Sequence, residues 1–313
     1  MSRIVKKVVV AGATGRMGPA VLKHLLERHF EVSVLTREPS TAKLPSGLEL
    51  IKADYSSTEA LTPSLLGKNF DAMIILLNRR LAAEKAATLE AAIAARIPHV
   101  IPSLFAFPVD NPDFENDAFM RPMYLGAQHF MQKAATGCFT HTTFHTGLFW
   151  EWQMDNDNVL KLYENGKPSF IFDGGEKPAT YTHTDDIGRA IAVSLQKLDQ
   201  TANKEFFIQS TALTQNKMLQ IAREADPERE FPVIHVESSK IQDDNTVVTD
   251  QGEQTLSPYA AFTGRITYGM HLAYFNQENL SNELFGIEQW TEEKLKNEIS
   301  RRVKSPDAYP RMF

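Results

Sequence analysis

Three glycines near the N-terminus have the spacing of a nucleotide-binding turn, in the segment Gly12-Ala13-Thr14-Gly15-Arg16-Met17-Gly18. Such a turn needs glycine to change direction sharply, to let the backbone approach a pyrophosphate, and to let a helix pack closely on a strand. The N–H groups at the start of the following helix attract the phosphates. A turn without a ligand is the alternative, but the strand-like run before it and the helical spacing after it favour a nucleotide site. We expect contacts to the dinucleotide from Gly12, Thr14, Gly15, Arg16, Met17 and Gly18.

The end of the second expected strand bears on which dinucleotide is bound. A site for NAD(H) would place an acidic residue there, to accept from the ribose 2′-hydroxyl. Here the strand ends Leu35-Thr36-Arg37, and Glu38 comes one residue later. Arg37 can pair with a 2′-phosphate and stack on the adenine, and Arg16 could form the other half of a clamp. Two alternatives stay open, that both arginines face solvent or that Glu38 neutralises Arg37; the chemistry favours NADP(H).

Residues that follow the other expected strands should complete the cofactor site, because ligands of such folds bind at the carboxyl ends of the strands. The third strand ends at Asp54, which we place on the adenine side. The fourth strand runs into Leu77 and Asn78, which we place under the ribose. Ser103 and Phe105 follow the fifth strand and are expected at the same edge.

The elements that would position these residues alternate regularly. Short apolar runs predict strands over 8–11, 32–35, 48–51, 71–77 and 99–101, and helical spacing predicts helices over 19–27, 58–65 and 81–95. This alternation predicts an α/β fold, a Rossmann-type doubly wound parallel sheet with right-handed crossovers.

The second half of the chain is less regular. We predict a polar loop over 105–123, a helix over 128–135, a strand over 140–146, and an irregular stretch over 241–269. Residues 1–150 then form the NAD(P)-binding Rossmann domain. Residues 151–313 form mainly a smaller C-terminal substrate-binding lobe, with some segments returning to the Rossmann core.

Composition excludes several classes of protein. With 313 residues and a net charge of −6, the chain has no clustered excess of Lys and Arg, so we expect no direct binding to nucleic acid. The single cysteine, Cys138, provides no disulfide framework and no cysteine-based metal site, and the histidine spacing suggests no metal site either. No apolar run is long enough to cross a membrane, so we expect a cytoplasmic protein. A homodimer stays open.

Several segments in order resemble one family. Besides the glycine turn and Thr36-Arg37, these segments are Ile101-Pro102-Ser103, Thr146-Gly147-Leu148-Phe149, Asp173-Gly174-Gly175, Asp185-Asp186-Ile187-Gly188 and Leu213-Thr214-Gln215-Asn216. The chain resembles the NmrA-like, isoflavone-reductase-like group of atypical short-chain dehydrogenases, especially its fungal members. The resemblance implies an NADP-binding fold with a C-terminal substrate lobe. Reductases of the group act on aromatic or phenylpropanoid-type ketones, ethers or enones, whereas other members are regulators that sense the dinucleotide.

The chain departs from that family where its acid/base group is expected. The resemblance implies a lysine at the start of the helix after the fifth strand, but the corresponding stretch is Met123-Tyr124-Leu125-Gly126-Ala127-Gln128. The Tyr-x-x-x-Lys pair of ordinary short-chain dehydrogenases is half present, since Tyr124 is followed four places later by Gln128. A tyrosine alone has a pKa near 10 and is a poor base at neutral pH.

Other residues could move the proton. His145 directly precedes Thr146-Gly147, where the backbone should approach the nicotinamide, so we predict it as the catalytic group, with Tyr124 second as a donor to a substrate oxygen. A structural, hydrogen-bonded role is the alternative for each, as it is for His129 and His141. Tyr124, Phe149, Trp150 and Trp152 could wall a pocket for a flat apolar substrate, or the aromatic side chains could be core.

The function these residues favour is an NADP(H)-dependent oxidoreductase acting on a hydrophobic aromatic or polyketide-like small molecule. The missing lysine leaves two alternatives. One is a non-redox enzyme on the same scaffold, an isomerase, dehydratase or cyclase. The other is an NmrA-like regulator that senses the dinucleotide.

Overall fold

The computed structural model describes residues 4–37, 44–78, 81–155, 160–162 and 166–304. The chain forms two compact units. The first consists of Met1–His145, Thr184–Ile208 and Ser281–Ile287, and the second of Thr146–His183, Gln209–Leu280 and Glu288–Phe313. That the second unit binds the substrate stays a prediction.

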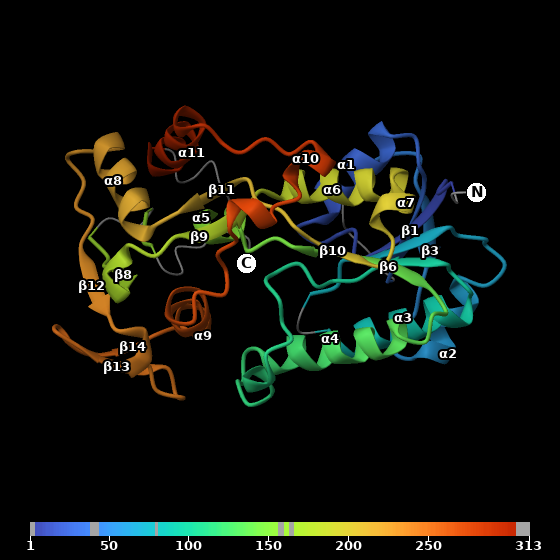
Figure 1. Ribbon diagram of the computed structural model, residues 1–313, viewed down its shortest axis with the longest axis horizontal. Coiled ribbons are helices and arrows are strands. Elements are labelled where there is room, and N and C mark those ends of the chain that lie inside the picture. The colour runs from blue at the N-terminus through green and yellow to red at the C-terminus, as the bar shows by residue number, and fades with distance from the viewer. Residues whose placement is uncertain (1–3, 38–43, 79–80, 156–159, 163–165, 305–313) are drawn as a thin grey trace. The chain divides into compact units, whose positions relative to one another are not determined.

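A seven-stranded parallel sheet forms the centre of the first unit (Figure 1), in the order β10-β6-β5-β4-β1-β2-β3. Its strands are β1 (Lys7–Ala11), β2 (Glu31–Thr36), β3 (Glu49–Lys52), β4 (Ala72–Ile75), β5 (His99–Ile101), β6 (Thr140–His145) and β10 (Lys204–Phe207). The chain builds outward from β1 to β3 on one side and then returns to add β4 on the other. The switch point between β1 and β4 confirms the predicted Rossmann-type doubly wound sheet.

Helices cover both faces of this sheet, and Figure 1 shows α1 beside α6 on one face and α3 beside α4 on the other. The helices are α1 (Gly18–Glu27), α2 (Thr58–Leu61), α3 (Ala82–Ala94), α4 (Arg121–Ala134), α6 (Thr184–Gln196), α7 (Leu198–Thr201) and α10 (Asn282–Phe285). Because side chains alternate along a strand, Val9 and Met73 join Leu89 of α3 and Phe130 of α4 in one core. The residues that alternate with Val9 and Met73 along β1 and β4 point to the opposite face of the sheet.

Contacts between α1 and α6 hold together segments more than 150 residues apart in the sequence. Gly188 of α6 allows this approach, since a Cβ there would lie 2.6 Å from the Ala20 carbonyl oxygen of α1. Asp185 Oδ1 lies 2.7 Å from Lys23 Nζ and 3.0 Å from His24 Nε2. The start of α6 is therefore also an ion-pair site that fixes this helix against α1.

The helix after the long loop begins earlier than the sequence indicated. We predicted a loop to Met123 and a helix from Gln128, but α4 begins at Arg121. Pro122 lies in its first turn, where the missing N–H costs nothing, and the Asp117 carboxylate accepts from the Phe119 and Met120 N–H groups. Tyr124 therefore lies inside a helix.

The second unit consists of small sheets and helices. Its elements are β7 (Leu148–Phe149), α5 (Trp150–Asp155), β8 (Ser169–Phe172), β9 (Ala179–Thr182), β11 (Thr211–Leu213), α8 (Gln215–Ala225), β12 (Val233–Val236), β13 (Thr246–Thr249), β14 (Gly252–Thr255), α9 (Pro258–Phe262) and α11 (Glu292–Lys304). The prediction of an irregular stretch over 241–269 was wrong, because β13 and β14 form a hairpin there and a π-helix spans Thr263–Gly269. Across the described part of the chain, no helix has the length and apolar character that crossing a membrane requires.

Candidate functional site

The glycine turn after β1 packs against the chain that follows β4. Gly12 has a φ of +82°, and a Cβ there would lie 2.9 Å from the Leu76 carbonyl carbon. Gly18 is more tightly constrained, because its Cβ would lie 1.7 Å from the Ala13 carbonyl oxygen. The N–H of Gly15 donates to the Gly12 carbonyl at 3.0 Å, and the N–H of Gly18 to the Gly15 carbonyl at the same distance. The turn therefore requires glycine at both of its ends.

The start of α1 presents a positive helix end that the chain does not neutralise. Met17 occupies the N-cap position without a side-chain hydrogen bond, and no acidic residue lies in the first turn. Thr14 and Gly15 are exposed beside it. A positive helix end with no carboxylate in its first turn suits an anion such as a pyrophosphate.

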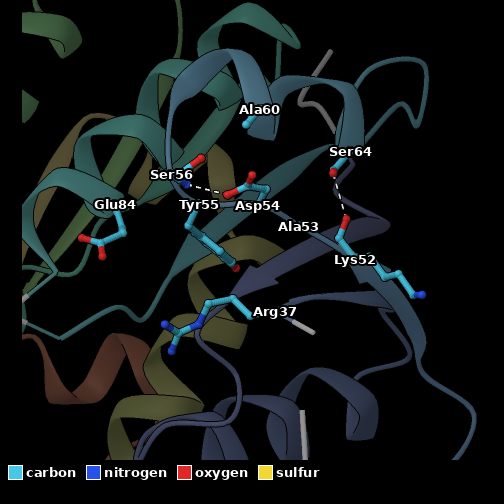
Figure 2. A pocket seen from close by; sticks show the side chains of 9 residues that line it. All are labelled: Arg37, Lys52, Ala53, Asp54, Tyr55, Ser56, Ala60, Ser64 and Glu84. Carbon is cyan, nitrogen blue, oxygen red and sulfur yellow. Dashed lines mark hydrogen bonds between the residues drawn. The ribbon is translucent and has the colours of Figure 1, made fainter. Parts of the chain in front are cut away.

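A cavity of about 640 Å³ opens where β2 and β3 end (Figure 2). Arg37 follows β2, Asp54 and Tyr55 follow β3, and Glu84 comes from the first turn of α3. The full lining is Arg37, Lys52, Ala53, Asp54, Tyr55, Ser56, Ala60, Ser64 and Glu84. Two residues predicted to contact the cofactor, Arg37 and Asp54, thus share one cavity.

Hydrogen bonds fix two of the cavity's side chains. The Tyr55 hydroxyl donates to the Leu35 carbonyl at 3.2 Å, and burial raises the pKa of this phenol although the nearby Arg37 charge opposes the rise. Hydrogen bonds from the backbone N–H and the hydroxyl of Ser56 lower the pKa of Asp54. The cavity therefore presents a neutral phenol, an ionised carboxylate and the Arg37 guanidinium.

Lys52 also lines this cavity and was not predicted from the sequence, and its ammonium group and the Arg37 guanidinium point in opposite directions (Figure 2). It is the last residue of β3 and pairs in register with Thr36, the residue before Arg37. Its position at the end of β3, the strand that pairs with β2, was the sequence signal that could have revealed it. Glu38, which one of the two alternatives has neutralising Arg37, lies outside the described residues. Arg16 is half-buried in the glycine turn, and its part in a clamp with Arg37 stays a prediction.

The ends of β4 and β5 meet at the same edge of the sheet. The Ser103 hydroxyl donates to the Leu77 carbonyl at 2.6 Å. Leu77 is buried, Asn78 is exposed, and Phe105 is half-buried. Gly12 lies against Leu76, so the structure brings the glycine turn, the end of β4 and Ser103 together at one edge.

His145 is the last residue of β6 and is held by the neighbouring strand β10. Its Nε2 lies 2.7 Å from a carboxylate oxygen of Glu205, and its ring stacks on Phe207 with 4.6 Å between centroids. Its Nδ1 is buried and has no hydrogen-bond partner in the described structure. The hydrogen bond from His145 lowers the pKa of Glu205 despite partial burial. An imidazole oriented by a carboxylate suits either proton transfer or a structural role.

The other histidines near α4 have structural partners. His129 Nε2 lies 3.2 Å from Glu90 of α3, and Lys133 Nζ lies 2.7 Å from the same carboxylate. His141 packs edge-on against Phe130, and burial lowers its pKa. Tyr124 is half-buried in the first turn of α4, and its hydroxyl has no hydrogen-bond partner among the described residues. That Tyr124 contacts a substrate stays a prediction.

The aromatic side chains after Gly147 belong to the second unit. Trp150 is completely buried, with its ring 4.8 Å from that of Trp290 and 6.0 Å from that of Tyr181. Of the two alternatives left open for Trp150, this packing favours the core. Phe149 and Trp152 are half-buried, and their place in a substrate pocket stays a prediction.

Comparisons with known proteins agree with this architecture. The family model described as the NmrA-like family matches residues 5–268. The chain belongs to the NmrA-like family. A curated relative, the oxidoreductase poxI of Penicillium oxalicum, is 28% identical over 232 residues, which are 72% of each chain. The resemblance seen in the sequence is thereby confirmed.

Solved structures share the fold of this NmrA-like protein. The complex of leucoanthocyanidin reductase with NADPH from Vitis vinifera superposes with a TM-score of 0.70, covering 94% of this chain and 99% of that chain at 19% identity. An isoflavone reductase structure gives a TM-score of 0.69 at 17% identity, with the same coverage of both chains. At these identities the likeness extends to the fold.

Proposed function

We propose that this chain is an NADP(H)-dependent oxidoreductase that reduces a hydrophobic aromatic or polyketide-like small molecule. The observation that carries the proposal is the place of Arg37 on the cavity at the ends of β2 and β3. NAD(H) carries a free 2′-hydroxyl that a guanidinium group does not match, whereas NADP(H) carries a phosphate that it does. The name of the fungal relative and the NADPH complex of the structural neighbour support the same chemistry.

The residues of the first unit fit such a cofactor. Gly12 and Gly18 keep Cβ atoms out of the turn, and the uncapped start of α1 would bind the pyrophosphate. Arg37 would pair with the 2′-phosphate, and Asp54 would bound the adenine side of the cavity. Ser103 fixes the end of β4 through its bond to Leu77. When bound, the cofactor supplies a hydride.

Tyr124 would orient the substrate. Its free hydroxyl can donate a hydrogen bond to a substrate oxygen, so that negative charge developing on that oxygen is stabilised. The burial of His145 and its bond to Glu205 favour an orienting role for that residue within the β6–β10 pair over direct contact with substrate.

The cofactor assignment is tested by titrating the protein with NADPH and NADH while following nicotinamide fluorescence. We expect NADPH to bind more tightly, and Arg37→Ala to weaken NADPH binding about 10- to 100-fold while changing NADH binding little, because a charge-assisted hydrogen bond to phosphate is lost. Lys217→Ala, which removes an exposed ion pair with Glu292, is the matched control. Equal affinities for the two dinucleotides in the native protein would contradict the assignment.

The reaction is tested by following absorbance at the nicotinamide band with a panel of aromatic ketones and enones. Oxidation of NADPH with formation of reduced product supports the proposal. NADPH binding without oxidation for the whole panel would favour a regulator. Conversion of a substrate without net loss of NADPH would identify a non-redox enzyme.

A further inference from the structure

Lys85, in the first turn of α3, is a half-buried cation that takes no part in the candidate cofactor site. Its side chain forms no hydrogen bond or ion pair within the described residues. Burial lowers the pKa of its ammonium group. Removing part of an unpaired ammonium group from water costs free energy.

The Nζ of Lys85 lies against the start of α4. A Cβ built on Gly126 would be 4.0 Å from this atom. Gly126 is two residues beyond Tyr124 in the stretch 123–128, where no lysine occurs. An ammonium group from α3 therefore reaches the stretch of α4 that lacks one of its own.

The ionisable side chains on the two helices leave this ammonium group without a counter-ion. Glu90 of α3 is engaged by Lys133 and His129 of α4, at 2.7 Å and 3.2 Å. Glu84, the residue before Lys85, lines the cavity that contains Arg37. The positive end of α3 makes a charge in its first turn still less favourable.

The position of Lys85 follows from the end of β4. Its backbone N–H donates to the Leu81 carbonyl, so it lies one turn into the helix that follows Leu77 and Asn78. Leu77 is bonded to Ser103, and Glu84 next to Lys85 faces the cavity (Figure 2). The first turn of α3 thus lies at the edge where the cofactor is proposed to bind.

We propose that Lys85 is the proton donor of the reduction, an inference that rests on the proposed function. As the hydride adds to the substrate carbon and the C=O π bond breaks, the Lys85 ammonium gives a proton to the substrate oxygen. A C–H and an O–H bond form, NADPH becomes NADP+, and the neutral amine takes a proton from water. For an enone the hydride adds at the β-carbon and the resulting enolate oxygen takes the proton. A lysine with a lowered pKa transfers a proton near neutral pH more readily than an ordinary one.

The test compares Lys85→Gln and Lys85→Arg with the native protein and with Lys133→Met, which removes the exposed lysine of the same helix pair. Arginine keeps the positive charge but does not release a proton at accessible pH. We expect both Lys85 variants to bind NADPH within about threefold of the native protein and to lose about 10²- to 10⁴-fold in kcat. The decline of native kcat at high pH should disappear in Lys85→Arg, and Lys133→Met should behave as native.

A second readout does not depend on turnover. Trace acetylation with acetic anhydride at a series of pH values, followed by mass spectrometry, reports how readily each amine reacts. Lys85 should become reactive at lower pH than Lys23, whose pKa is raised by its bond to Asp185. Bound NADPH together with substrate should reduce labelling of Lys85.

The outcomes separate this proposal from the proposed function. A native protein that oxidises NADPH, with Lys85 variants within twofold of its kcat, rejects Lys85 as donor and leaves the oxidoreductase intact. Labelling of Lys85 that matches Lys133 in pH dependence and is unchanged by ligands rejects it as well. A native protein inactive on the whole panel rejects the oxidoreductase, and the assignment of Lys85 falls with it.

Discussion

Gly18 and Gly126 show how the surroundings of a glycine decide whether an added methyl group lowers or raises the stability of the fold. At Gly18 a Cβ would lie 1.7 Å from a backbone carbonyl oxygen, so α1 would have to move away from the turn. At Gly126 a Cβ would meet only the Lys85 Nζ, at the ordinary contact distance of 4.0 Å. The first glycine is required by packing, and the second leaves space that the Lys85 side chain approaches.

We therefore expect opposite effects from two alanine substitutions. Gly18→Ala should lower the free energy of unfolding by about 1–3 kcal/mol, through overpacking, and should weaken NADPH binding. Gly126→Ala should raise the free energy of unfolding by about 0.5–1 kcal/mol, because alanine in a helix interior limits the unfolded chain. Urea titration measures both. Destabilisation of similar size in the two variants would contradict this account.

The sequence revealed residues whose chemistry is local and missed those whose role depends on packing. The positions of Gly12 and Gly18 in a tight turn and of Arg37 after β2 were predictable, because a turn and a strand end are short-range features. Lys85 lies in an alanine-rich stretch where a lysine is typical of a solvated helix face. The packing of α4 beside α3 brings its Nζ next to Gly126, and that contact joins residues about 40 positions apart.

At the scale of elements, β6 and β10 are joined by the pair of His145 and Glu205 as well as by their parallel ladder. The hydrogen bond from His145 lowers the pKa of Glu205. A carboxylate whose pKa is lower in the folded state stabilises the fold above its unfolded pKa, near 4.3, and this contribution is lost as pH falls through the folded pKa.

Glu205→Gln should remove that contribution. Because 45% of the Glu205 side chain is exposed, solvent screens the pair and we expect a loss of only about 0.5 kcal/mol at pH 7. The difference between native and variant protein should shrink as the pH falls below 4. Guanidinium titrations at pH 7, 5 and 3.5 measure it, with Lys68→Gln, which loses an exposed partner of Glu49, as control. A difference that grows toward low pH would mean that His145 does not stabilise the ionised carboxylate.

Elements with strong periodicity were predicted well and those fixed by local hydrogen bonds were not. The first five strands of the sheet were each expected within a few residues of their observed positions, because buried parallel strands are continuous apolar runs. The start of α4 was missed because Pro122 reads as a loop residue although it suits a first turn. The β13–β14 hairpin was missed because its strands carry polar side chains, such as Thr246 and Gln254.

At the scale of the whole molecule, the first unit is assembled from three separate stretches of chain. A fragment ending at His145 would lack β10, which covers the edge of β6, and α6, which packs on α1. The cofactor-binding unit therefore cannot be completed until residues beyond 280 have been made. The return of these segments to the first unit could not be located in the sequence, because β10 and α10 are each only four residues long and give little periodic signal.

Cofactor binding should consequently be measurable as an increase in the melting temperature of the full-length chain. A ligand that binds only the folded state adds RT ln(1 + [L]/Kd), about 2.7 kcal/mol at a concentration one hundred times Kd. For a unit of this size each kcal/mol corresponds to about 2–4 °C, so we expect saturating NADPH to raise the melting temperature by several degrees. The same concentration of NADH should raise it less.

In Arg37→Ala the two dinucleotides should give equal shifts, because the group that distinguishes them has been removed. Differential scanning fluorimetry measures all four conditions, and a larger shift with NADPH that persists in Arg37→Ala would mean that another residue reads the 2′-phosphate.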